Sequence, residues 1–187
     1  MTTAGVAQVD LAGDERRVGT GVVVLDRLLE ELAGAGGFGL TLEIAPDEPD
    51  AEVGRAGAAL GEALGPLLEG AGAAGRGFGV AAADEALAMV VVERSGRPLV
   101  VSNADLSSTR AGGLRADLAA TLLDELARTA GLTVHVRLIE GESSQHVLSA
   151  IFKALGIALA EALRRNGNLL AQDQVPREDP EATRGEG

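Results

Sequence analysis

LLEELAGAGGFGLTLEI, from Leu28 to Ile44, occurs a second time in altered form as LLDELARTAGLTVHVRL, from Leu122 to Leu138. Further along the chain, ALGEAL (Ala59–Leu64) returns as ALGIAL (Ala154–Leu159). The same order of segments therefore occurs twice, about 94 residues apart. Self-similarity at a fixed spacing is the signature of a repeated structural unit, so we expect a chain built from two related halves.

The first copy has the pattern of a helix, a strand, a loop and a second helix. Four leucines between Leu25 and Leu32 have helical spacing, and the glycines that follow predict the end of this helix. Residues 40–44 then alternate between apolar and polar side chains, as in a half-buried strand. Prolines and acidic residues from Pro46 to Asp50 predict a loop, and Val53–Leu68 has the apolar face of a second helix.

The second copy repeats this order. The pattern predicts a helix over Leu114–Ala130, a strand over Leu132–Glu140, a loop over Gly141–Ser144 and a long helix over His146–Arg165. Each half thus supplies the same elements, which predicts that the two halves fold alike.

The segment between the copies predicts two strands, Glu85–Glu93 and Pro98–Ser102, joined by a turn at Ser95-Gly96-Arg97. Together these elements predict an α+β fold of two βαβ-type halves, in which helices cover one face of each sheet. We expect the first half to span residues 1–93 and the second half residues 94–165. Residues 166–187 have five acidic residues, two prolines and little apolar content, which predicts a disordered acidic tail.

Composition excludes several classes of function. The net charge is −12 and the chain has three Phe but no Tyr or Trp, which argues against nucleic-acid binding because phosphates need clustered cations and bases need aromatic platforms. The absence of Cys excludes disulfides and cysteine metal sites. We find no signal segment and no run of 18 apolar residues, so we expect a cytoplasmic protein without a membrane span.

Two glycine-rich runs match the G-x-G-x-x-G pattern, GAGGFG (Gly34–Gly39) and GAGAAG (Gly70–Gly75). A dinucleotide site needs this pattern between a strand and a helix, whereas each run here follows a predicted helix. We therefore interpret both runs as helix ends and turns.

Acidic residues gather in the loop predicted after the first strand: Asp47, Glu48, Asp50 and Glu52. Such a cluster could attract a divalent cation weakly, but acidic loops are more often simply solvated. The sequence leaves both interpretations open, with solvation favoured. His135 lies between two valines of a predicted strand and is interpreted as structural.

Longer strings resemble one known family. TGVVVLDRLLEELAGAGGFGLTLE, ADEAL, ERSGRP and GESSQHVLSAIFKALGIALAEAL occur in this order, and they resemble imidazoleglycerol-phosphate dehydratase, an enzyme of histidine biosynthesis, from about Gly19 to Leu163. The most specific match is FKA (Phe152–Ala154), with Gly141 and His146 in register. The resemblance implies a ribosomal protein S5 domain 2-like fold made by internal duplication, in agreement with the repeat.

The resemblance also implies two manganese ions, which are held by histidines and glutamates from both halves and bind the imidazole of the substrate. Aligned with the family's blocks LDHML, HHTVED and HH-x-x-E, this chain has other residues at nearly every ligand position: Arg27, Asp50, Ala51, Gly54, Gln145, His146 and Ser149. One histidine remains, and an arginine brings a fixed positive charge toward the cation. We therefore predict that no metal cofactor is bound.

Phosphate-binding positions are better retained. Arg97 (in SGRP) and Lys153 (in FKA) match residues that contact the substrate phosphate in the family. A further phosphate arginine of the family falls at Gly77, with Arg76 one position away as a substitute. The alternative is that these cations are solvated or pair with acids such as Asp84.

Three functional hypotheses follow from the resemblance. The first, which the lost ligands favour, is a catalytically silent paralogue that keeps the scaffold and binds at most a small phosphate or other anion. The second is an active dehydratase, a carbon–oxygen lyase, and the third is a regulatory or assembly subunit. The family forms trimers that join through metal sites into a larger particle, so we expect a homo-oligomer that stops at the trimer.

Overall fold

The computed structural model describes residues 5–104, 110–111 and 114–165. The predicted acidic tail, residues 166–187, lies outside the described residues. Within the described part, strands and helices alternate in the order expected from the repeat, and further strands flank them.

The first sheet consists of β1 (Val6–Asp10), β2 (Arg16–Gly19) and β3 (Gly39–Glu43), with β3 in the centre. β1 pairs with β3 in the antiparallel sense and β2 pairs with it in the parallel sense. Helix α1 (Val23–Gly36) connects β2 to β3, and α2 (Pro49–Glu69) follows β3. A helix between two neighbouring parallel strands is the crossover that parallel pairing requires.

The second sheet has the order β4-β5-β9-β6. Its members are β4 (Arg76–Ala83), β5 (Ala86–Glu93), β6 (Leu99–Ser102) and β9 (Thr133–Glu140). β5 is antiparallel to both of its neighbours, β4 and β9, and β6 runs parallel to β9. Two remaining short strands, β7 (Arg110–Ala111) and β8 (Leu114–Arg115), pair with each other and precede α3 (Ala116–Ala130), and α4 (Ser144–Leu163) follows β9.

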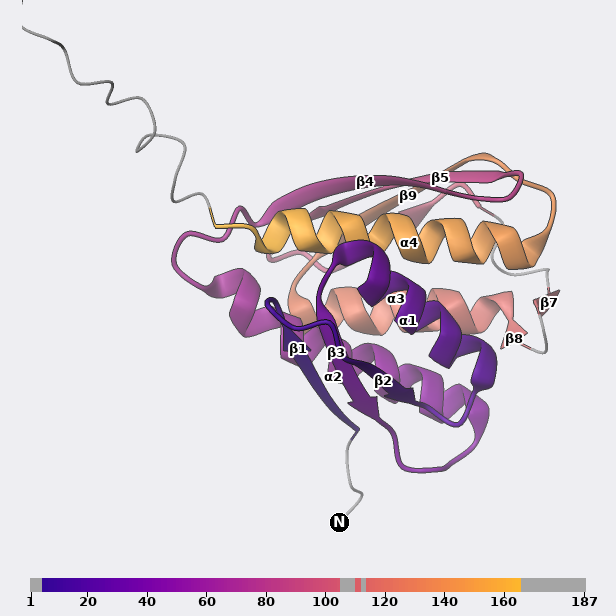
Figure 1. The fold of residues 1–187 in the computed structure, drawn as a ribbon, viewed down its shortest axis with the longest axis horizontal. Coiled ribbons are helices and arrows are strands. Elements are labelled where there is room, and N and C mark those ends of the chain that lie inside the picture. The colour runs from indigo at the N-terminus through magenta and orange to yellow at the C-terminus, as the bar shows by residue number, and fades with distance from the viewer. Residues whose placement is uncertain (1–4, 105–109, 112–113, 166–187) are drawn as a thin grey trace, which may run out of the picture.

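The helices lie between the two sheets (Figure 1). α1 and α2 pack on the first sheet, whereas α4 packs on β4 and β5 and α3 packs beside β6. Across the middle, α1 packs against α4 and α2 packs against α3, so each helix pair joins one helix from each half. The predicted α+β fold, with helices on one face of each sheet, is confirmed.

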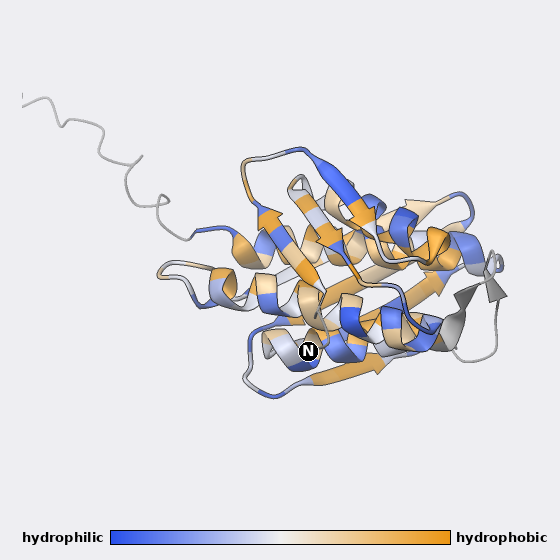
Figure 2. Ribbon diagram, turned by 90° about the horizontal axis from the view of Figure 1, so that it is seen from below, coloured by the Kyte–Doolittle hydropathy of each residue, from blue (hydrophilic) through white to orange (hydrophobic). Residues whose placement is uncertain are grey.

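The core is aliphatic, as the scarcity of aromatic residues predicts. Leu28, Leu32, Leu122 and Leu126 are fully buried at the centre of the helix layers, and Phe152 is the largest buried side chain among the described residues. Figure 2 shows hydrophobic and hydrophilic residues alternating along the helices, which matches their partly buried positions.

Helix α4 is long and apolar enough to cross a membrane by length and composition alone, with a mean hydropathy of 1.6 over its best window. In the fold it is a central helix, and 67% of that window is buried against β4, β5 and α1. Packing between a sheet and a neighbouring helix accounts for its apolar character.

Both glycine runs end helices, as predicted. Gly37 has a φ of 68° and its N–H donates to the carbonyl of Gly34, while Phe38 N–H donates to that of Ala33. This left-handed ending is the one that glycine favours after a helix. In the second run, Gly72 and Gly75 have φ of 94° and 68° in the turn between α2 and β4.

The loop predicted over Pro46–Asp50 is shorter than expected. α2 begins at Pro49 instead of Val53, with Pro in the first turn and Asp50 and Glu52 close behind it. A proline at this position is already fixed in a helical φ, and carboxylates are favourable near the positive end of the helix dipole.

Five of the described strands were missed: β1, β2, β4, β7 and β8, the last of which takes the first two residues of the helix predicted over Leu114–Ala130. In β4 the sequence RGFGVAAA has two glycines and three alanines, which strands disfavour in general. Here glycine is required, because a Cβ at Gly77 or Gly79 would lie 2.1 Å from a carbonyl oxygen of α4. β4 and β5 come before residue 94, but they belong to the same sheet as β9. The boundary between the two sheets therefore falls between α2 and β4, and not at residues 93/94.

Candidate functional site

A hollow of about 210 Å³ lies where the first turns of α4 meet α1 and the turn between β4 and β5. Most of its wall comes from positions that the sequence analysis had singled out. The lining residues are Arg27, Glu31, Ala83, Asp84, Gln145, His146, Ser149 and Lys153.

Helical spacing brings these side chains together. Gln145, Ser149 and Lys153 follow one another at intervals of four residues along α4, and Arg27 and Glu31 have the same spacing on α1. Residues four apart lie on one face of a helix, so the packing of α1 on α4 presents the two faces to each other.

Glu31 connects the two helices. The Ser149 hydroxyl, which is only 7% exposed, donates a hydrogen bond to the Glu31 carboxylate. Arg27 Nε lies 3.7 Å from Glu31 Oε1, which is an ion pair but too long for a hydrogen bond. The position of a ligating Glu in the family is therefore a serine that binds a carboxylate of this chain.

His146 is held by two carboxylates from the β4–β5 turn. Its Nδ1 lies 2.5 Å from Glu85 Oε2 and its Nε2 lies 3.3 Å from Asp84 Oδ2. Both ring nitrogens are thus occupied by protein atoms. Asp84 adopts a φ of 48°, which is uncommon outside glycine and turns this residue back toward α4.

The Glu85 carboxylate is a strongly stabilised anion. Ser143 N–H, at the start of α4, donates to Glu85 Oε1 at 2.9 Å. This backbone hydrogen bond first, and the contact with His146 second, lower the pKa of Glu85 to about 2. The carboxylate therefore fixes the β4–β5 turn to the beginning of α4.

The ligand positions of the first copy lie elsewhere. Asp50, Ala51 and Gly54 are at the start of α2, which packs against α3. A Cβ at Gly54 would lie 4.0 Å from Thr121 Cγ2. In the internal repeat, Gly54 corresponds to Ser149 and Thr121 corresponds to Arg27. The contact between α2 and α3 is therefore the counterpart of the contact between α4 and α1.

The acidic cluster before α2 is used inside the protein. Asp47 forms an ion pair with Arg55, and the pKa of Asp47 is lowered by the backbone N–H of Glu48 and by Arg55. Glu52 is 6% exposed, and its Oε1 accepts the Asp47 N–H at 2.8 Å. These contacts stabilise the start of α2, and they show that Asp47 and Glu52 are not simply solvated, as the sequence had favoured.

The predicted anion-binding residues do not come together within one chain. Lys153 lies at the α1–α4 hollow, but Arg97 is exposed in the β5–β6 turn, where its carbonyl accepts Thr133 Oγ1 at 2.9 Å. Arg76 begins β4 and pairs in register with Glu93. Asp84 contacts His146, and within the described residues neither Arg97 nor Lys153 pairs with an acid, which leaves the alternative that these cations are solvated.

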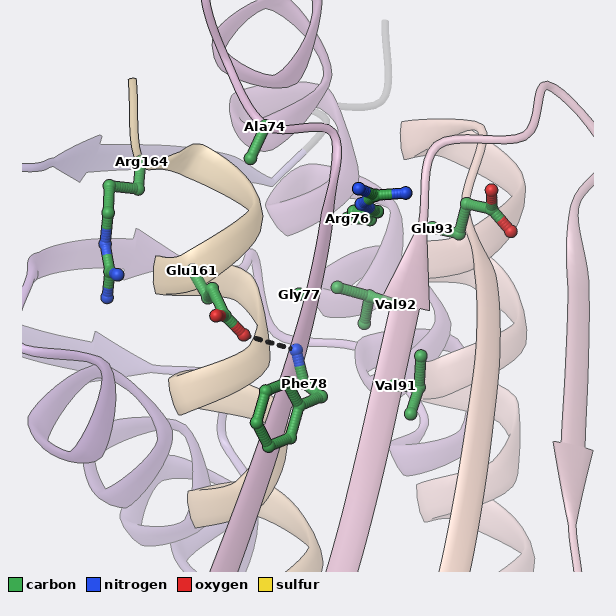
Figure 3. Close-up of a pocket in the computed structure, with 9 residues that line it drawn as sticks. All are labelled: Ala74, Arg76, Gly77, Phe78, Val91, Val92, Glu93, Glu161 and Arg164. Carbon is green, nitrogen blue, oxygen red and sulfur yellow. Dashed lines mark hydrogen bonds between the residues drawn. The ribbon is translucent and has the colours of Figure 1, made fainter. Parts of the chain in front are cut away.

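Arg76 lines a larger hollow of about 530 Å³ beside the open edge of β4 (Figure 3). Glu161 of α4 points toward β4 and accepts the Phe78 N–H at 2.7 Å. Arg164, the other cation of this hollow, lies on the opposite side of β4 from Arg76 in Figure 3. The two guanidinium groups therefore do not converge on one ligand.

His135 lies on β9, in register with Val91 on one side and Val101 on the other. It is exposed on the outer face of the second sheet, away from α4. It takes no part in the core or in the α1–α4 hollow.

Comparison with known proteins agrees with the fold. The family model for imidazoleglycerol-phosphate dehydratase matches residues 20–159. The chain belongs to this family. It is 38% identical over 169 residues to the imidazoleglycerol-phosphate dehydratase of Anaeromyxobacter sp. (strain K), covering 87% of this chain and 81% of that protein. It is 35% identical over 173 residues to that of Desulforudis audaxviator, covering 90% and 86%.

Solved structures of the dehydratase family have the same architecture. The Staphylococcus aureus enzyme superposes with a TM-score of 0.79 at 29% identity, covering 87% of this chain and 95% of the other. The enzyme of Pyrococcus furiosus, solved with (S)-C348, gives a TM-score of 0.79 at 24% identity, covering 92% and 96%. The predicted family membership is confirmed.

The residues present do not fit the dinuclear manganese site that the dehydratase family implies. In the α1–α4 hollow, a guanidinium occupies one ligand position and a serine another, and the one remaining imidazole has both nitrogens in contact with carboxylates. Within the described ranges, no group of three or more His, Cys, Asp or Glu side chains is placed to hold a metal ion.

Sequence reasoning missed Glu31 and the contacts of Asp84 and Glu85 with His146, although it had considered Asp84 as a partner for the cations. Asp84 and Glu85 belong to the string ADEAL, which carried part of the family resemblance, so their block was visible although their role was not. Glu31 had no signal of its own, because a glutamate on a charged helix face is ordinary.

Proposed function

We propose that this chain is a catalytically silent member of the dehydratase family. The observation that carries the proposal is Arg27, whose guanidinium lines the α1–α4 hollow at a position that the resemblance assigns to a metal-binding histidine. Two unit charges 4 Å apart interact by about 4 kcal/mol at an effective dielectric constant near 20, and each manganese ion carries two charges. A cation at this position is therefore opposed by the protein itself.

The contacts around Arg27 support the proposal. Glu31, the carboxylate beside Arg27, forms an ion pair with it and also accepts the Ser149 hydroxyl, so both of its oxygens already have partners in the protein. The imidazole that could bind a metal, His146, lies between Asp84 and Glu85. Binding a metal through His146 Nε2 would require breaking the contact of that nitrogen with Asp84, because a ligating nitrogen must be free of a competing partner.

Metal analysis of the purified full-length chain tests the proposal directly. We expect no stoichiometric manganese, and no turnover of imidazoleglycerol phosphate when the protein comes from a host that lacks its own dehydratase. About two Mn per chain, or turnover from such a host, would overturn the proposal.

The runner-up is an active dehydratase of histidine biosynthesis. The observation in its favour is the extent of the similarity, 38% identity across 87% of the chain, to a protein named as the enzyme. The same assay separates the two, and complementation of a histidine-requiring strain gives an independent readout. A third hypothesis, a regulatory or assembly subunit, predicts that this chain co-purifies with an intact dehydratase expressed beside it.

We also propose that the chain forms a homotrimer. The outer face of the second sheet supports this, because Phe78 and Val80 are 58% and 46% exposed there and adjoin the half-buried Met89 and Val91. A large exposed apolar face on a sheet marks an interaction surface. Since larger particles in the family depend on metal sites, assembly is expected to stop at the trimer, in a soluble cytoplasmic protein.

A further inference from the structure

The first sheet has one strand fewer than the second within the described residues. β1, β3 and β2 match β5, β9 and β6 in order and in direction, as the internal repeat implies. The second sheet continues outward from β5 to β4, but no described strand lies outside β1. The outer edge of β1 is therefore open, and Figure 1 shows this strand at the margin of its sheet.

The inward side chains of β1 lack the cover that their counterparts have. Ala7 and Val9 are only half-buried against the core. Their counterparts in β5, by register with β9, are Val90 and Val92, which are fully buried and pair with β4. A further strand outside β1 would remove Ala7 and Val9 from water in the same way, which is favourable for apolar side chains.

Helix α2 offers a surface for such a strand. In the second half, β4 lies so close to α4 that a Cβ at Gly79 would stand 2.9 Å from the Ala158 nitrogen. Ala158 corresponds to Ala63 of α2 through the repeated strings ALGIAL and ALGEAL. Ala63 is only half-buried, and α2 packs on β1. A strand beside β1 would therefore lie on α2 as β4 lies on α4.

The other outer strands carry features that discourage strand addition, such as charge, short length or cover. β2 carries Arg16 and Arg17, and β6 has four residues. On β4, Glu161 of α4 accepts the Phe78 N–H at 2.7 Å. β1, with the sequence VAQVD, has no Pro, Lys or Arg, so its main-chain groups are the most available of the described sheet edges.

The chain leaves α4 at the end of the molecule where β1 ends. Arg164, directly after α4, lines one hollow together with Gly36 at the end of α1. β3 begins shortly afterwards at Gly39, which pairs with Asp10, the last residue of β1. A segment that continues from residue 165 along β1 would therefore run antiparallel to it, as β4 runs to β5.

We propose that Leu169–Val175 (LLAQDQV), in the C-terminal segment of this chain, adds to the open edge of β1 as the fourth strand of the first sheet. The segment carries one charge, Asp173, and lies between the turn signal Asn166-Gly167 and Pro176, where a strand stops. Its main chain supplies the binding, as in other strand additions. The contact forms within one copy and replaces, for these seven residues, the disorder predicted from sequence.

Pairs of introduced cysteines test this in the full-length chain, because the wild type has no Cys. Gln8→Cys, at an exposed position in the middle of β1, is combined in turn with Leu170→Cys, Ala171→Cys, Gln172→Cys and Asp173→Cys. Neighbouring residues of a strand point to opposite faces. Disulfide formation, measured by peptide mass spectrometry after mild oxidation, should therefore alternate along these four positions, by about fivefold, because a disulfide needs close Cβ atoms.

Arg17→Cys is the matched control for Gln8→Cys. Both residues pair in register with Thr41, from opposite sides, so they share one face of the sheet but lie on opposite edges. Equal yields at all four tail positions, equal yields with Arg17→Cys, or disulfides that join two copies would overturn the inference.

Hydrogen exchange of the β1 amides gives a readout without cysteines. Gln172→Pro removes an N–H from the added strand and should speed this exchange, whereas Ala182→Pro, beyond the segment, should not. Exchange that is unchanged by Gln172→Pro would contradict the inference. Neither experiment involves a metal or a substrate, so the inference can fail while the proposed function stands.

Discussion

Gly156 of α4 lies so close to α1 that a Cβ at this position would stand 1.9 Å from the carbonyl oxygen of Leu32. The duplicated half repeats the contact, since a Cβ at Gly61 of α2 would lie 2.9 Å from the carbonyl oxygen of Leu126 in α3. Both helix pairs therefore cross at a glycine, and this close approach brings the faces of α1 and α4 together at the hollow.

Gly156→Ala should destabilise the protein by about 1–3 kcal/mol, the range for overpacking a core, because the clashing atom is main chain and cannot move alone. Gly61→Ala should cost less, since its contacts are looser. The measurement is urea unfolding followed by circular dichroism.

Gly54→Ala is the control for these variants. A Cβ there meets nothing nearer than 4.0 Å, so the change should be neutral or stabilise the helix by up to about 1 kcal/mol. Equal losses at Gly156 and Gly54 would show that the helix crossing is not the cause.

Glu85→Gln should remove a pH-dependent part of the stability. The folded-state pKa of Glu85 is lowered from 4.5 to about 2, so its contribution is fully present above pH 4.5 and is lost as the pH falls toward 2. The difference in unfolding midpoint between wild type and Glu85→Gln should therefore shrink as the solution is acidified through this range.

Glu142→Gln, which removes an exposed carboxylate from the same loop, is the control and should show no such convergence with the wild type. If the difference in unfolding midpoint between wild type and Glu85→Gln stays constant from pH 5 to pH 3, the lowered pKa of Glu85 is contradicted.

Arg27→His combined with Ser149→Glu should create metal binding that the wild type lacks. The change removes the opposing charge and supplies two ligand groups on neighbouring helices beside His146. At a free manganese concentration ten times the dissociation constant, the stabilisation should be about 1.4 kcal/mol, measured by thermal unfolding with and without chelator. If manganese stabilises the wild type by the same amount, the silent-paralogue proposal is contradicted.

Val80→Lys should break the trimer. A charge in the middle of the exposed apolar face of the second sheet cannot be buried without a partner, so light scattering should give a mass near the 18.9 kDa of one chain. Val23→Lys, at an apolar position on α1 that is 81% exposed, should leave the assembly unchanged. A wild-type mass near twenty-four chains would sink the trimer prediction.

The sequence by itself determined the order of the duplicated elements, the glycine ends of the helices, the family and the absence of ligand histidines. Each of these features depends only on the local spacing of residues or on the identity of single residues. Helix α1, for example, is predicted from its four buried leucines and Gly37.

Only the tertiary structure decided what the remaining side chains do. Glu31 and Ser149 are 118 residues apart and Glu85 and His146 are 61 apart, so no local pattern links them. β4 escaped prediction for the same reason, because its glycines are explained by the main chain of α4 and not by the strand itself. Contacts of this kind depend on how the helices pack between the two sheets, which is set by the whole buried core at once.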